Sequence, residues 1–130
     1  MRILLTEDDD SVRAFVSRAL ELDGHQVETA CHGLEALERL IECDGGFDLL
    51  VTDVKMPIMD GIALAHEASG QWPRLPILLM TGFADQRERA EELTEVIRDV
   101  VTKPFTLQQI REAVSEAAAD PNGAETEEAA

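Results

Sequence analysis

Five polar side chains each stand at the end of a short run of apolar residues. In chain order they are Glu7, Asp8, Asp53, Thr81 and Lys103. Three carboxylates in one place repel one another, and they repel an anionic phosphoryl group further, unless a divalent cation lies among them. Mg²⁺ suits such a place, because this hard cation binds carboxylates together with waters, a backbone carbonyl and a phosphoryl oxygen. The pattern therefore predicts a Mg²⁺ site for phosphate chemistry.

Asp53 is the candidate nucleophile of this site. It interrupts the stretch "LLVTDVKMPIMDG", in which an apolar run ends abruptly in a charge. A carboxylate beside Mg²⁺ can attack phosphorus and form an acyl phosphate. In such a transfer the Thr81 hydroxyl would hydrogen-bond one phosphoryl oxygen, and the Lys103 amine would neutralise another.

The hydrophobic pattern predicts the elements that bring these residues together. Short apolar runs bounded by Gly, Pro or polar residues predict strands over residues 2–6, 26–30, 47–52, 76–81 and 98–102. Helical spacing predicts helices across 12–20, 34–41, 62–68 and 107–117, and a mostly charged segment predicts a weaker one over 85–95. This alternation implies right-handed crossovers and a three-layer α/β fold of the (βα)5 type with a parallel sheet. Such sheets bind ligands at the carboxyl ends of their strands, where all five polar residues fall.

Length and charge limit the possible functions. The chain has 130 residues, 45% of them hydrophobic, which suits one domain with a single core. We expect this domain to span 1–119 and the acidic segment 120–130 to be a disordered tail. The formal net charge of -16 argues against direct binding to nucleic acid or to an anionic membrane. No signal peptide or membrane span is recognised, so we expect a cytoplasmic protein.

Each motif also has a purely structural interpretation. "EDDDS" is a plausible helix cap, in which Asp9 or Asp10 accepts backbone hydrogen bonds. "MPIMDG" and "TG" are ordinary turn sequences, and "TKP" can simply end a strand. The functional interpretation is favoured because all of these motifs fall at the same end of consecutive predicted strands.

Over residues 1–119 the sequence resembles the receiver domains of bacterial two-component response regulators. The acidic pair, "TDVKMPIMDG", "LMTG" and "TKPF" occur in the order and spacing of that family. The resemblance implies a flavodoxin-like, doubly wound five-stranded parallel sheet with strand order 2-1-3-4-5.

The same resemblance implies a role for each site residue. Asp53 becomes the phosphorylation site, and Thr81 becomes the switch hydroxyl. Lys103 becomes the phosphate-binding amine, and its peptide bond to Pro104 is expected to be cis. The Mg²⁺ ligands are expected to be Glu7, Asp8, Asp53 and the backbone carbonyl of Lys55.

Partners are implied in the same way. A histidine kinase or histidine phosphotransferase would supply the phosphoryl group, and phosphorylation would change the affinity for a downstream protein partner. A phosphate shuttle or sink in a phosphorelay is the alternative. The protein is not expected to be an enzyme beyond catalysing its own phosphorylation and slow dephosphorylation. An aspartyl-phosphate phosphatase would carry a second acid where this chain has Lys55.

Two departures from the common receiver pattern indicate which kind of receiver the sequence resembles. Val100 stands where receivers commonly have an aromatic residue, and the chain stops after its last predicted helix, as in a stand-alone receiver. "RILLTEDDDS", "TGFA" and the Val before "TKPF" resemble CpdR-type regulators. Such regulators receive phosphate from a phosphotransferase and influence regulated proteolysis.

Two further side chains are expected to flank the site and to lengthen the life of the phosphoryl group. Lys55 lies two residues after Asp53, and Phe83 lies two residues after Thr81. A long cationic chain can hydrogen-bond a phosphoryl oxygen, and a bulky ring can exclude water from the in-line path. Phosphorylation is expected to perturb residues 82–105 most, because Thr81 would pull the following segment with it.

Overall fold

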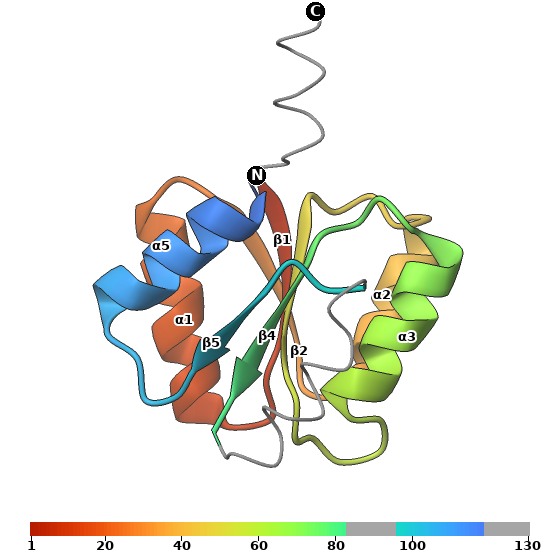
Figure 1. The fold of residues 1–130 in the computed structure, drawn as a ribbon, viewed down its shortest axis with the longest axis horizontal. Coiled ribbons are helices and arrows are strands. Elements are labelled where there is room, and N and C mark those ends of the chain that lie inside the picture. Colours follow the sequence, from red (N-terminus) through yellow and green to blue (C-terminus); the bar gives the residue numbers. More distant parts are fainter. Residues whose placement is uncertain (83–95, 119–130) are drawn as a thin grey trace, which may run out of the picture.

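The structure, a computed structural model, describes residues 1–82 and 96–118. Five parallel strands form one sheet in the order β2-β1-β3-β4-β5, and helices cover both of its faces (Figure 1). The strands are β1 (Arg2–Thr6), β2 (Gln26–Ala30), β3 (Leu49–Asp53), β4 (Ile77–Thr81) and β5 (Asp99–Thr102). The described helices are α1 (Asp10–Leu22), α2 (Gly33–Glu42), α3 (Gly61–Gln71) and α5 (Leu107–Ala118). The predicted doubly wound fold and its strand order are confirmed.

Three predictions lie outside the described residues. They concern the helix over 85–95, the placement of Phe83 and the tail over 120–130. The domain limits of 1–119 likewise stay a prediction.

The alternating side chains of the strands build two separate cores. Leu4, Leu50 and Leu79 lie in the core beneath α2 and α3, whereas Ile3 and Val51 lie in the one beneath α1 and α5. Figure 1 shows these helix pairs on opposite sides of the sheet. Successive side chains of a strand point to opposite faces, so a sheet covered on both faces needs apolar residues at nearly every position. This explains the unbroken apolar runs of β3 and β4.

The third strand is shifted relative to its predicted range of 47–52. Its first paired residue is Leu49, opposite Ile3, and its last is Asp53, opposite Met80. Phe47 precedes the strand, and the Arg2 guanidinium lies over its ring, 4.7 Å from the ring centroid. Asp53 is therefore the last residue of the strand rather than the first residue after it.

Arg2 ties together several segments at the amino-terminal edge of the sheet. Its guanidinium donates to the Gly46 carbonyl and to Glu28, each at 2.8 Å. Its backbone nitrogen donates to the Asp48 carboxylate at 2.7 Å. This edge is opposite to the one that carries Glu7, Asp8 and Asp53.

Side-chain caps fix where two helices begin. Asp9 accepts hydrogen bonds from the backbone of Ser11 and Val12 at 2.9 and 3.0 Å, so it caps α1. Asp60 caps α3 in the same way through Ala63. Asp9 is therefore the cap residue within "EDDDS", and the two preceding acids, Glu7 and Asp8, remain available for another role. None of the helices described is both long and apolar enough to cross a membrane.

Candidate functional site

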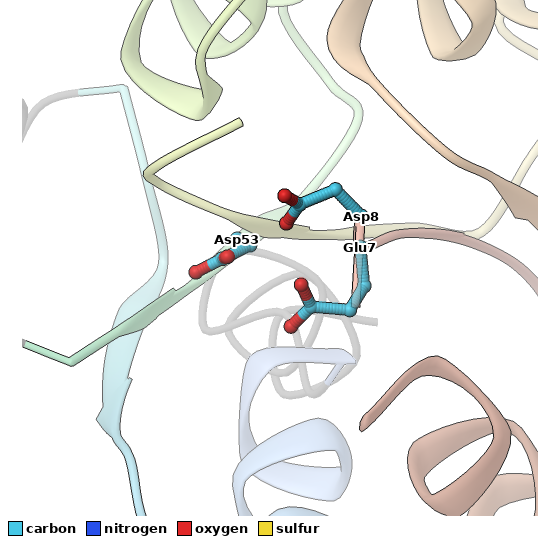
Figure 2. A group of neighbouring side chains, drawn as sticks. All are labelled: Glu7, Asp8 and Asp53. Carbon is cyan, nitrogen blue, oxygen red and sulfur yellow. The ribbon is translucent and has the colours of Figure 1, made fainter. Parts of the chain in front are cut away.

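Three carboxylates meet at the carboxyl-terminal edge of the sheet. Glu7 and Asp8 directly follow β1, and Asp53 ends the neighbouring strand β3 (Figure 2). Each offers an oxygen, and these oxygens lie within 4.8 Å of one another. Glu7 and Asp53 are buried, whereas Asp8 is exposed. The site is thus a half-buried acidic cluster that is open to solvent on the side of Asp8.

Lys103 joins two of these carboxylates. Its ammonium nitrogen lies 2.5 Å from Glu7 Oε1 and 3.2 Å from Asp53 Oδ2. The lysine follows β5, and its backbone nitrogen donates to the Thr81 carbonyl at 2.6 Å. The peptide bond between Lys103 and Pro104 is cis. The ends of β1, β3 and β5 therefore supply one ion-pair network.

The backbone fixes the remaining carboxylate oxygens of this network. Glu7 Oε2 accepts a hydrogen bond from the Asp9 backbone at 3.2 Å, and Asp53 Oδ1 accepts one from Val54 at 3.0 Å. Since buried carboxylates need such partners, these bonds hold the two side chains in one orientation.

Burial dominates the electrostatics of the site. It raises the pKa of Glu7 to about 7, against the hydrogen bond from Lys103, and the charge of Asp53 raises it further. Burial also raises the pKa of Asp53, against the charge of Lys103. Burial lowers the pKa of Lys103, but its two carboxylate partners outweigh that effect and raise it. A site with these pKa shifts favours an added cation, because two buried carboxylates share one lysine.

Thr81 contributes a buried hydroxyl with no hydrogen-bond partner within the described part of the chain. The residue ends β4, next to the strand that carries Asp53, and none of its surface is exposed. Leaving a buried polar group unsatisfied costs about 1–3 kcal/mol. A hydroxyl in this condition is available to a ligand that carries an acceptor oxygen.

Comparison with known families assigns the chain to one of them. The family model for the response regulator receiver domain matches residues 3–115. This chain belongs to the response regulator receiver family. Receivers are the regulatory phosphoacceptor domains of two-component systems, and the resemblance drawn from the acidic pair and the three motifs is confirmed.

Receiver relatives of two kinds match the sequence. The response regulator receiver protein CpdR of Brucella abortus is 42% identical over 109 residues, which cover 84% of this chain and 89% of that protein. The sensor histidine kinase TmoS of Ectopseudomonas mendocina is 34% identical over 116 residues, which cover 88% of this chain. The chain spans only 12% of that kinase.

Solved receivers share the fold. A receiver domain protein from Clostridium thermocellum has a TM-score of 0.82 at 27% identity, with 90% of this chain and 93% of that chain covered. TrrA from Thermotoga maritima, solved in complex with Mg²⁺-BeF, has a TM-score of 0.79 at 27% identity, with 89% and 97% covered.

The receiver residues predicted from the sequence come together in the structure. Glu7, Asp8, Asp53 and Lys103 form one cluster, and Thr81 is linked to it through its carbonyl. Lys55 is exposed and lines the cavity above this cluster. Phe83, which is predicted to flank the site, lies outside the residues described.

An apolar half of this cavity was missed from the sequence. The cavity has a volume of about 670 Å³, and Val12, Phe15 and Phe105 line it beside the acidic cluster. Phe15 fits the apolar spacing of α1, yet it is 43% exposed and stacks on Phe105 with ring centroids 6.4 Å apart. The motif "TKPF" could have indicated this apolar lining, because Phe105 follows Lys103 at the same strand end.

Proposed function

We propose that this receiver accepts a phosphoryl group on Asp53 from a histidine kinase or a histidine phosphotransferase. An oxygen of the Asp53 carboxylate would attack phosphorus, the P–N bond to the donor imidazole would break, and its electron pair would stay on the imidazole nitrogen. The observation that carries this proposal is Lys103, held between Glu7 and Asp53 at the open edge of the sheet.

The chain's donor atoms fit Mg²⁺. Glu7, Asp8 and Asp53 offer three hard oxygens within 4.8 Å of one another, and we infer that the Lys55 carbonyl would complete the protein's share. When bound, the ion would offset the negative charge that Asp53 and the phosphoryl group bring together. The Mg²⁺-BeF complex of TrrA, a receiver of the same fold, supports this assignment.

Lys103 and Thr81 would meet the charge that develops on phosphorus. The lysine already contacts the reacting carboxylate at 3.2 Å, so a phosphoryl oxygen on Asp53 would lie within its reach. The buried Thr81 hydroxyl has no described partner, and it would gain one by donating to another phosphoryl oxygen. These two contacts would distinguish the phosphorylated state from the free state.

We further propose that the phosphorylated protein acts by switching its affinity for a protein partner in the cytoplasm. A coupling free energy of about 1–3 kcal/mol between phosphorylation and partner binding would suffice for such a switch. The 42% identity to CpdR, over most of both chains, makes a regulator of proteolysis the first partner class to test. The likeness to segments of sensor kinases supports the second candidate, a phosphate shuttle or sink in a phosphorelay.

Acetyl phosphate tests the chemistry without a partner. With Mg²⁺ present, the intact mass of the wild type should rise by one phosphoryl group, and the Asp53→Asn variant should stay unmodified. Asp48→Asn makes the matched control, because Asp48 lies at the opposite edge of the sheet. Full modification of the Asp53→Asn variant would refute the proposed phosphoacceptor.

A further inference from the structure

Ile58 occupies an unusual backbone conformation in the loop between β3 and α3. Its φ is 71°, and the Met59 nitrogen donates across it to the Pro57 carbonyl at 2.8 Å. A hydrogen bond from one residue to the second residue before it, with positive φ in between, defines the rarer and more strained form of the γ-turn.

The residue type makes this turn costly. Glycine adopts positive φ freely, and asparagine does so at moderate cost, whereas a β-branched side chain there is a true outlier. Strained conformations persist only where the surroundings enforce them, and they gather at functional sites. A glycine or an asparagine at residue 58 would fold more easily than the isoleucine that the chain carries.

Close contacts on one side of the turn enforce the strained conformation. The Met59 carbonyl accepts a hydrogen bond from the Gly33 nitrogen at 3.1 Å, and a Cβ on Gly33 would lie 2.3 Å from that carbonyl oxygen. Two residues further on, Gly61 donates to the Val54 carbonyl at 2.8 Å. The loop thus has little freedom to relax.

Burial does not offset the strain in the free protein. The side chain of Ile58 is 73% exposed, more than any other large apolar side chain among the described residues. The free protein therefore carries both a strained turn and a bare apolar group, five residues after the phosphoacceptor. An outside partner that buries the side chain would explain both.

We propose that Ile58 is the anchor by which this receiver docks its protein phosphodonor. The inference rests on the proposed function, because any protein that brings a phosphohistidine to Asp53 must cover the edge of the sheet on which this loop lies. Asp8, Asp9 and Asp10 are exposed on the β1–α1 side of that edge. The donor should therefore carry an apolar socket for Ile58 with basic side chains beside it. A second copy of this chain fits poorly, since its net charge of -16 is equally negative.

Three variants separate anchoring from folding. Ile58→Asn removes the apolar group and eases the turn, and Ile58→Val keeps a smaller apolar group in the same place. Ile41→Asn is the matched control, because Ile41 is 56% exposed but belongs to α2, where its φ is not positive. The donor is the fastest member of a panel of purified, autophosphorylated histidine kinases and histidine phosphotransferases.

We expect Ile58→Asn to raise the ratio of folded to unfolded protein about threefold to tenfold in urea unfolding. The same variant should lower kcat/KM for transfer from the protein donor about tenfold, because it loses a buried apolar contact. Ile58→Val should stay within about threefold of the wild type in transfer. Ile41→Asn should transfer at the wild-type rate.

Acetyl phosphate separates failure of this inference from failure of the proposed function. Equal labelling of the wild type and Ile58→Asn, together with slowed transfer from the protein donor, supports the docking role. Equal transfer from the protein donor overturns that role and leaves the phosphoacceptor intact. A wild type that acetyl phosphate does not label overturns both. A less stable Ile58→Asn variant would overturn the strain that motivates the inference.

Discussion

Among the buried residues of the site, Thr81 differs from its neighbours in having a side chain with no described partner. Glu7, Asp53 and Lys103 satisfy one another, whereas the buried Thr81 hydroxyl has no hydrogen bond within the described residues. A group that destabilises the free state and gains a partner on phosphorylation shifts the balance between the two states. The hydroxyl is thus suited to report phosphorylation.

Replacing Thr81 by valine should therefore stabilise the free protein. We expect Thr81→Val to raise the free energy of unfolding by about 1 kcal/mol, because it removes an unsatisfied buried hydroxyl. In urea unfolding with Mg²⁺ and beryllofluoride, a phosphoryl analogue, the variant should gain less stability than the wild type does.

Thr52→Val is the control for this prediction. Thr52 is equally buried, but its hydroxyl donates to the Asp53 carbonyl at 3.0 Å. Its replacement should lower the free energy of unfolding by about 1 kcal/mol. If both variants were destabilised alike, the Thr81 hydroxyl would have to be satisfied in the free protein.

At the scale of elements, the start of α3 packs directly against Asp53, the proposed phosphoacceptor. Gly61 is the first residue of that helix, and a Cβ added to it would lie 2.1 Å from the Asp53 carbonyl oxygen. Helix α3 can approach β3 this closely only because the residue is glycine. The position of the helix and the position of Asp53 therefore depend on each other.

Two glycines of α3 should respond oppositely to the same substitution. Gly61→Ala should lower the free energy of unfolding by about 1–3 kcal/mol, since the strand and the helix must separate to admit the methyl group. It should also slow labelling of Asp53 by acetyl phosphate. Gly70→Ala meets no atom within 4 Å and should raise the free energy of unfolding by about 0.5–1 kcal/mol. Matching urea curves and labelling rates for the two variants would contradict this dependence.

The same elements show what the sequence could and could not predict. The alternation of apolar runs and helical spacing was enough for the parallel three-layer fold, whereas the strand order came from the resemblance to receiver domains. Parallel strand ends were enough to gather Glu7, Asp53 and Lys103. The limits of β3 follow from its pairing with β1 and β4, and these are long-range contacts that no local pattern contains.

Two surface features were also not predicted by the sequence pattern. Phe15 has the spacing of a buried helical residue, yet the cavity beside α5 leaves it 43% exposed. The strained turn at Ile58 lies within a motif that already predicts a turn, but the motif does not give the sign of φ. Side-chain exposure and backbone sign follow from tertiary packing, which spacing alone does not specify.

At the scale of the whole molecule, the dominant feature is the excess of negative charge. The chain has a formal net charge of -16, and three of its carboxylates lie together at one edge of the sheet. Such an excess repels itself in the compact state and attracts cations. A divalent ion at this edge would thus act on the stability of the entire domain.

Mg²⁺ should therefore stabilise the protein more than NaCl of the same ionic strength does. We expect a gain of about 1–3 kcal/mol in the free energy of unfolding at concentrations well above the dissociation constant. Asp8→Asn should lose most of this gain in urea unfolding. Glu67→Gln, which removes the same charge from an exposed position of α3, should keep it. An undiminished gain in Asp8→Asn would contradict a Mg²⁺-binding role for Asp8.

The contacts of Arg2 have a practical consequence for how such measurements are made. They anchor the start of the chain at one edge of the sheet, and parallel strands run from there to the acidic cluster at the other. A biosensor chip that captures the protein through a tag at its amino terminus would thus present the acidic edge to the flowing donor. Random coupling through surface lysines would instead modify Lys55, which lines the cavity beside Asp53.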